Sequence, residues 1–138
     1  MKLTDQLTQD FKLSEFFITS QAGGQAGLWA DFMALPEAKR KAYYSNILQV
    51  AKYLQCLRSL IGKPINITSG WRSPRVNELV GGVSDSRHLT GQAADFNIAG
   101  MTPKEVQRIL DPWWFGGLGY GDTFTHTDIR PTKTRFNY

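Results

Sequence analysis

The sequence is poor in residues that could cross-link the chain or anchor it in a membrane. Its 138 residues include one cysteine, Cys56, so no disulfide can form within the chain. No stretch approaches the roughly 18 consecutive apolar residues that a membrane helix needs. The first residues also lack the apolar segment of a signal peptide. We therefore expect neither membrane insertion nor a signal peptide, and we expect Cys56 to be buried in a helix as a small apolar side chain.

The chain also lacks a strong excess of charge of either sign. The formal net charge is +4, and lysines and arginines are scattered along the sequence, so we expect no nucleic-acid partner. Hydrophobic residues make up 41% of the chain and charged residues 20%, which are the proportions of a folded globular protein. The length suits one domain over residues 1–138, and a monomer is the favoured oligomeric state.

The spacing of apolar residues predicts an α+β fold. Apolar side chains recur at helical intervals over residues 37–61, and the glycine and proline that follow indicate a helix end there. The glycine-rich residues 21–27 predict a loop. Shorter helices and three strands are predicted over residues 73–80 and 102–110, and over residues 65–69, 93–98 and 124–130. Because helices come first and the strands are short, we expect a small antiparallel sheet packed against helices.

The sequence contains only two histidines, His88 and His126, and both lie in or beside the predicted strands. Side chains alternate along a strand, so Asp95 lies on the face opposite its apolar neighbour Phe96. The predicted strand at His126 can aim its histidine at the same point, and a turn at Gly91 can bring His88 there. Two imidazoles and one carboxylate, with a fourth position open, are the ligand set of a catalytic zinc. The sequence therefore predicts a zinc hydrolase.

The residues around the first histidine are Ser86-x-His88-x-x-Gly91-x-Ala93-x-Asp95. This pattern resembles the signature of the M15 metallopeptidases. That family includes zinc D-Ala-D-Ala carboxypeptidases, D-Ala-D-Ala dipeptidases and phage L-Ala-D-Glu endolysins, and it shares its zinc fold with hedgehog domains. Residues 11–16, 69–74, 116–120 and 126–130 are similar to the family as well. The resemblance implies a Zn²⁺ ion held by His88, Asp95 and His126. It also implies a peptidoglycan stem peptide as substrate, cleaved by a D,D-carboxypeptidase or an L,D-endopeptidase.

The resemblance places Arg72 near the substrate. There its guanidinium could bind a carboxylate or polarise the scissile carbonyl. The alternative role is an ion pair that fixes the turn at residues 69–74. Ser86 is expected to orient the loop of His88 through hydrogen bonds, because the sequence pairs no base with its hydroxyl.

The general base is the weak point of the resemblance. Many relatives carry an acid three residues before the last zinc histidine, or a second histidine two residues before it, and this chain has Thr123 and Phe124 at those positions. We predict Asp122 as the base, with Asp128 as the second candidate. Asp128 could instead orient an imidazole through a hydrogen bond to the nitrogen that does not bind the metal, or form a salt bridge with Arg130 or Arg72.

Two further expectations concern the surface and the setting. The aromatic residues 113–115 could edge a peptide groove, although core packing is favoured. Small M15 proteins without a signal peptide resemble phage endolysins or virion lysis proteins. The expected setting is thus synthesis in the cytoplasm, with a phage-infected bacterium as one case, and action at the cell wall. The competing hypothesis is a non-catalytic zinc-containing domain that binds cell wall or belongs to a virion.

Overall fold

A five-stranded sheet forms the centre of the computed structural model, which describes residues 1–138. The sheet order is β1-β2-β4-β3-β5. The strands are β1 (Asn66–Ser69), β2 (Ala93–Asn97), β3 (Gly117–Tyr120), β4 (Thr125–Asp128) and β5 (Thr134–Asn137). All neighbouring pairs are antiparallel except β3 and β5, which are parallel. The α+β class is confirmed, whereas the sheet is mixed rather than wholly antiparallel.

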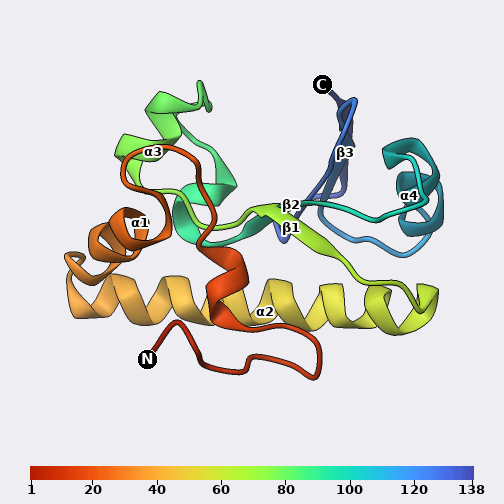
Figure 1. The fold of residues 1–138 in the computed structure, drawn as a ribbon. Helices are drawn as coiled ribbons and strands as arrows, with labels where there is room; N and C mark the ends of the chain where they lie inside the picture. Colours follow the sequence, from red (N-terminus) through yellow and green to blue (C-terminus); the bar gives the residue numbers. More distant parts are fainter.

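Helices flank this sheet, and the longest one runs beneath it (Figure 1). The α-helices are α1 (Gly24–Met33), α2 (Glu37–Ile61), α3 (Pro74–Leu79) and α4 (Pro103–Leu110). Two short 3-10 helices are η1 (Leu13–Phe16) and η2 (Arg87–Thr90). Figure 1 shows α1 and α3 toward one end of α2 and α4 toward the other. None of the helices combines the length and the apolar character that a membrane crossing requires.

Helix α2 has the bounds that its apolar spacing predicts. It ends at Ile61, and the following Gly62 adopts a left-handed conformation with φ of 66°, which glycine reaches without strain because it has no Cβ atom. One stripe of α2 is buried against the core, formed by Ile47, Val50, Ala51, Leu54 and Leu57. Cys56 lies two residues after Leu54 and therefore points away from this stripe. It is exposed, so the expectation that it is buried was wrong.

The predicted loop at residues 21–27 was too long, because α1 already begins at Gly24. Glycine has a low helix propensity, which is why the sequence favoured a loop. Tertiary packing outweighs that propensity here: Leu28 and Phe32 of α1 are fully buried in the core. The ring of Phe32 packs edge-on against Phe17 and Trp71 at centroid distances of 5.1 Å.

Two strands were missed, and both lie in the C-terminal part of the sheet. Strand β3 has glycine at alternate positions, a composition that is depleted in strands. Strand β5 is a partly exposed edge strand of four residues, too short for a clear alternation of apolar side chains. The predicted strand over residues 124–130 is shorter in the structure, where β4 ends at Asp128.

The aromatic residues 113–115 divide between core and surface. Trp114 is 1% exposed, and its indole nitrogen donates to the carbonyl oxygen of Asp128 at 3.0 Å. Trp113 and Phe115 are each 39% exposed. The core role is confirmed for Trp114, and none of the three lines the cavity described below.

Candidate metal centre

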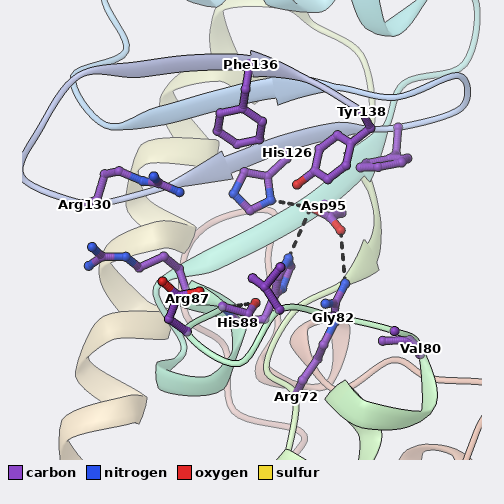
Figure 2. A pocket seen from close by; sticks show the side chains of 15 residues that line it. Arg72, Val80, Gly82, Arg87, His88, Asp95, His126, Arg130, Phe136 and Tyr138 are labelled. Atoms are coloured by element: carbon purple, nitrogen blue, oxygen red, sulfur yellow. Dashed lines mark hydrogen bonds and ion pairs between the residues drawn. The ribbon is translucent and has the colours of Figure 1, made fainter.

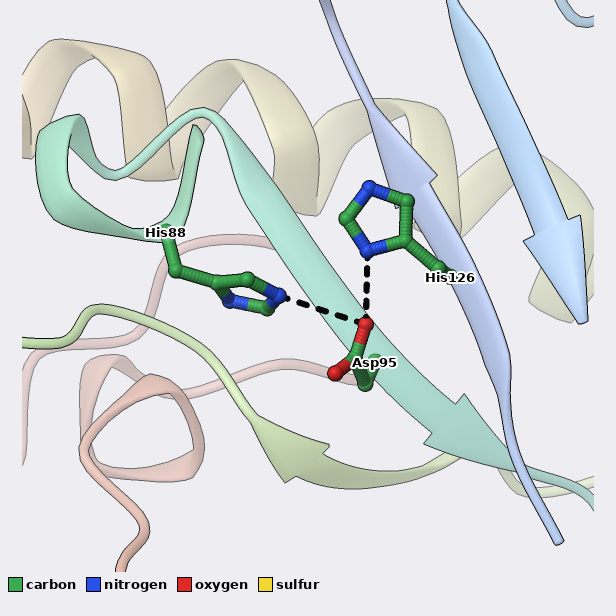
Figure 3. Close-up of side chains that lie close together, drawn as sticks. All are labelled: His88, Asp95 and His126. Atoms are coloured by element: carbon green, nitrogen blue, oxygen red, sulfur yellow. Dashed lines mark hydrogen bonds and ion pairs between the residues drawn. The ribbon is translucent and has the colours of Figure 1, made fainter. Parts of the chain in front are cut away.

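Three buried side chains from different elements meet at one point of the sheet (Figure 3). His88 comes from η2, Asp95 from β2 and His126 from β4. Asp95 and His126 are direct partners in the β2–β4 register, so the side chains share a face and lie close together. One potential ligand atom from each of the three residues lies within 4.8 Å of the others. The predicted ligand set is thus assembled as one cluster.

The loop before β2 is built to deliver His88 to this cluster. The Ser86 hydroxyl caps η2 by accepting a hydrogen bond from the backbone N–H of His88 at 3.2 Å. Gly91 ends η2 with φ of 78°, a left-handed conformation that glycine adopts readily. The carbonyl oxygen of His88 accepts from the backbone N–H of Arg72 at 3.1 Å. These bonds place the imidazole beside β2, as the roles inferred for Ser86 and Gly91 require.

Each imidazole uses one nitrogen for its support and presents the other to Asp95. The Nδ1 atom of His88 lies 2.7 Å from the carbonyl oxygen of Gly70, which can only accept, so Nδ1 carries the proton. Its Nε2 atom lies 3.3 Å from Asp95 Oδ1. In His126 the roles are reversed, because Nε2 lies 2.8 Å from Asp128 and Nδ1 lies 2.8 Å from Asp95 Oδ1. Supports of this kind fix the tautomer and orientation of metal-binding histidines.

Electrostatics keep Asp95 ionised in this cluster. Burial alone would raise the pKa of its carboxyl, but the charges and hydrogen bonds of His88 and His126 hold that pKa well below its usual range. Burial likewise lowers the pKa of the His126 imidazole, yet its hydrogen bonds to Asp128 and Asp95 outweigh burial, and the pKa is raised. A carboxylate between two supported imidazoles suits a divalent cation, which replaces the protons that the cluster would otherwise hold. The donor set fits zinc.

Arg72 flanks the cluster on the side of β1. Its Nη2 atom lies 3.4 Å from Asp95 Oδ2, and its Nε atom donates to the Ser69 hydroxyl at 3.0 Å. A third bond joins Nη1 to the side-chain oxygen of Asn77 at 3.3 Å. Burial lowers the pKa of Arg72, and the charge of Asp95 opposes this shift. The arginine therefore braces the turn at residues 69–74 and also reaches Asp95 of the cluster. Its contact with substrate stays a prediction.

The cluster lies in an open cavity of about 690 Å³ (Figure 2). Three arginines line it, namely Arg72, Arg87 and Arg130, against the two carboxylates of Asp85 and Asp95. Aromatic side chains from the C-terminal strands complete the wall: Phe124, Phe136 and Tyr138. The cavity is thus large enough for a peptide segment and carries an excess of positive charge that suits an acidic ligand.

The two candidate bases are placed very differently. Asp128 is fully buried and accepts hydrogen bonds from the Gly117 backbone N–H at 3.0 Å and from Arg130 Nε at 2.8 Å. Together with the bond to His126, these contacts hold the carboxylate behind the imidazole. Asp122 is exposed on the turn before β4 and does not line the cavity. The structure brings Asp128 to the cluster as the partner of His126 and leaves Asp122 outside.

Comparison with known proteins agrees with this geometry. The family model described as Peptidase M15 matches residues 9–129. The chain belongs to the peptidase M15 family. The resemblance seen in the signature around His88 is confirmed by this match.

Three named relatives show how this M15 chain compares with longer proteins. The zinc D-Ala-D-Ala carboxypeptidase of Streptomyces albus G is 46% identical over 52 residues, which are 37% of this chain and 20% of that protein. The peptidoglycan L,D-endopeptidase MepK of Escherichia coli K12 is 33% identical over 86 residues, or 56% of this chain and 47% of that protein. A probable MepK of Haemophilus influenzae is 31% identical over 96 residues, 64% of this chain and 52% of that protein. The M15 chain thus matches about half or less of each relative's length.

Strand β3 of this M15 chain presents only glycines to the functional face. Gly117 and Gly119 pair with Asp128 and His126 of β4, so they lie on the face that carries the cluster. A Cβ atom at Gly117 would collide with the carboxylate of Asp128, and one at Gly119 would lie 2.5 Å from the Phe136 ring. Because these glycines have no side chains, Asp128 of β4 and Phe136 of β5 can lie over β3.

The C-terminal wall contains cavity residues that the sequence did not indicate. Phe136 and Tyr138 reach the cavity only because β5 pairs with β3. Burial of the phenol end in the cavity, together with the charge of Asp95, raises the pKa of Tyr138 to about 12. The alternate positions of Phe136 and Tyr138 were the available sequence signal, but two residues are too few to define a strand face.

Proposed function

We propose that this M15 chain is a zinc-dependent peptidase that hydrolyses an amide bond in peptidoglycan stem peptides. The observation that carries the proposal is the buried cluster of His88, Asp95 and His126 at an open cavity, with the second nitrogen of each imidazole held in place. Structural zinc sites are closed by four protein ligands, whereas three ligands beside a cavity leave a position for water and substrate. The names of the relatives supply the substrate class.

The residues around the cluster suit amide hydrolysis. A bound Zn²⁺ supplies a Lewis acid that polarises a carbonyl and makes water nucleophilic near neutral pH. Gly70 and Asp128 hold the imidazoles so that their free nitrogens face the metal position. Arg72 lies beside Asp95, where a guanidinium can donate to a carbonyl oxygen that gains negative charge. The hydrolysis adds water across the C–N bond, giving a carboxylate and an amine.

The positive cavity wall favours a substrate that carries carboxylates. Arg87 extends into the cavity and forms no ion pair with the protein, unlike Arg130, whose Nη2 atom lies 2.6 Å from Asp128 Oδ2. A peptide substrate carries a carboxylate at its C-terminal end, which these arginines can bind. We therefore infer that the enzyme acts at the cell wall. We also expect a monomer that binds no nucleic acid, and a phage origin stays a prediction.

Incubation of the purified protein with purified peptidoglycan tests this function. We expect zinc-dependent release of peptide fragments, detected by mass spectrometry and abolished by a chelator. Release of single D-alanine residues would identify a carboxypeptidase, whereas larger fragments would identify an endopeptidase. The control is Asp95→Asn, which keeps the size of the side chain and removes the charge that the metal needs.

The competing hypothesis of a non-catalytic zinc domain makes a different prediction in the same assay. Protein that carries one zinc per chain and still releases no fragment would contradict the proposed peptidase activity. Binding to intact peptidoglycan, measured by co-sedimentation, would then support the wall-binding alternative.

A further inference from the structure

Strand β5 brings a hydroxyl group to the metal centre from the far end of the sequence. Its backbone pairing continues past the strand, because the N–H of Tyr138 donates to the Tyr120 carbonyl at 3.0 Å. Phe136 and Tyr138 are two residues apart and therefore share the face that carries His126. Their ring centroids lie 5.4 and 6.2 Å from that of the imidazole. Tyr138 is thus placed beside His126 of the cluster by the pairing of β3 with β5.

The phenol end of Tyr138 is directed into the cavity. Figure 2 shows its oxygen atom pointing toward His126 and Asp95, with Arg72 approaching Asp95 from the other side. The residue as a whole is 68% exposed, so it stands at the mouth of the cavity rather than in the core. Phe124 and Phe136 pack against the ring at centroid distances of 5.0 and 5.5 Å and restrict its position.

The hydroxyl of Tyr138 is free to bind a ligand. Its phenol oxygen lies at the cavity and makes no hydrogen bond within the protein. The other hydroxyl lining the cavity, that of Ser86, already accepts from the His88 backbone. The guanidinium of Arg130 is held by Asp128. Tyr138 therefore carries the cavity hydroxyl that makes no hydrogen bond within the protein.

We propose that Tyr138 is a substrate-contacting residue that donates a hydrogen bond to the carbonyl oxygen of the scissile amide, opposite Arg72. The assignment rests on the proposed peptidase function. A phenol O–H donates a hydrogen bond to a carbonyl oxygen without any proton transfer. The bond strengthens as negative charge develops on that oxygen, which stabilises the transition state more than the bound substrate. No covalent bond to the tyrosine forms or breaks.

The substitution Tyr138→Phe tests this role because it removes only the hydroxyl. We expect kcat on stem peptides to fall by about 100-fold, the usual effect of losing one such donor, with KM changed by less than about threefold. Tyr120→Phe is the matched control, since Tyr120 lies on the same sheet and does not line the cavity. We expect this control to keep wild-type kinetics.

A second readout does not depend on peptidase activity. Acetohydroxamate binds active-site metal through oxygen atoms that accept hydrogen bonds, and its affinity can be titrated by the visible spectrum of the Co²⁺-substituted protein. We expect Tyr138→Phe to weaken this affinity about tenfold, because one hydrogen bond to a charged group is lost. The spectrum of the ligand-free Co²⁺ protein should stay unchanged.

The outcomes separate this assignment from the proposed function. An active wild-type enzyme whose Tyr138→Phe variant keeps both kcat and acetohydroxamate affinity would overturn the role of Tyr138 and leave the peptidase standing. A changed spectrum of the ligand-free variant would also overturn it, because the phenol would then belong to the metal coordination. If the wild type releases no peptide, the function fails, and a selective loss of acetohydroxamate affinity would still place the donor at the metal position.

Discussion

The floor and the C-terminal wall of the cavity are built with different degrees of constraint. At the floor, His88, Asp95 and His126 are each less than 8% exposed, and every imidazole nitrogen has a partner. In the wall, Tyr138 reaches the cavity with a hydroxyl that makes no hydrogen bond within the protein, and Arg87 of η2 extends into the same cavity without an ion pair. A fixed floor suits a metal ion, whose ligands must keep their geometry. A freer wall suits a substrate, whose polar groups need unoccupied partners.

Substitutions in the floor should therefore remove the metal, whereas substitutions in the wall should lower activity with the metal still bound. The largest effect is expected for His126→Ala and His88→Ala. Each variant loses one of three protein ligands, so zinc should be absent after dialysis and peptidase activity undetectable. Metal analysis by mass spectrometry checks this, and a variant that retains one zinc per chain would refute the ligand assignment.

Asp128 lies behind the floor, so its substitution should act on zinc through His126. We expect Asp128→Asn to lower zinc affinity by about 10- to 100-fold, the usual effect of losing the partner of a metal-bound histidine. Competition with a fluorescent zinc chelator measures the change. If Asp128 were the general base instead, kcat would collapse while zinc affinity stayed at the wild-type value.

Acidification should also lower the zinc affinity of the floor. A histidine must be neutral at its ligating nitrogen to bind zinc. Despite the opposing effect of burial, the bonds to Asp128 and Asp95 raise the pKa of His126 in the metal-free protein. Protons should therefore compete with zinc from a pH above the ordinary histidine pKa of 6.5. Zinc affinity, titrated from pH 8 downward, should fall by up to about tenfold per pH unit as His126 becomes protonated.

Gly119 tests the wall, because it separates β4 from the ring of Phe136. A methyl group in Gly119→Ala would displace that ring, which we expect to cost about 1–3 kcal/mol in the free energy of unfolding. Activity should fall while zinc remains bound. Urea denaturation measures the first effect, and the double variant with Phe136→Leu should recover part of the lost stability. Loss of zinc in Gly119→Ala would show that wall and floor are one unit.

The smallest effect is expected at Asp122. The carboxylate is exposed and lies outside the cavity, so Asp122→Asn should change kcat by less than about twofold. The sequence predicted this residue as the general base, and that role remains testable by the same measurement. A loss of 100-fold or more, with zinc bound, would show that the turn carries Asp122 to the reacting water.

The floor could be predicted from local sequence because most of its determinants are close together. Ser86, His88, Gly91 and Asp95 lie within ten residues, where a cap, a left-handed turn and strand alternation dictate how side chains point. The long helix α2 was predictable for the same reason, since its apolar spacing and its terminal Gly62 are local signals. Cys56 shows the limit of composition: one residue off the buried stripe is enough to expose it.

The wall depends on contacts between distant segments. Strand β3 has glycines that argue against a strand locally, and they become favourable only when Asp128 and Phe136 must lie across it. The parallel pairing of β3 with β5 then decides that Phe136 and Tyr138 face the metal centre. The local sequence of residues 86–95 determined where His88 and Asp95 of the metal cluster lie. The pairing of strands far apart in the chain decided which side chains surround the metal cluster. The sequence of a single segment does not reveal such a pairing, because any two strands can form the same backbone hydrogen bonds.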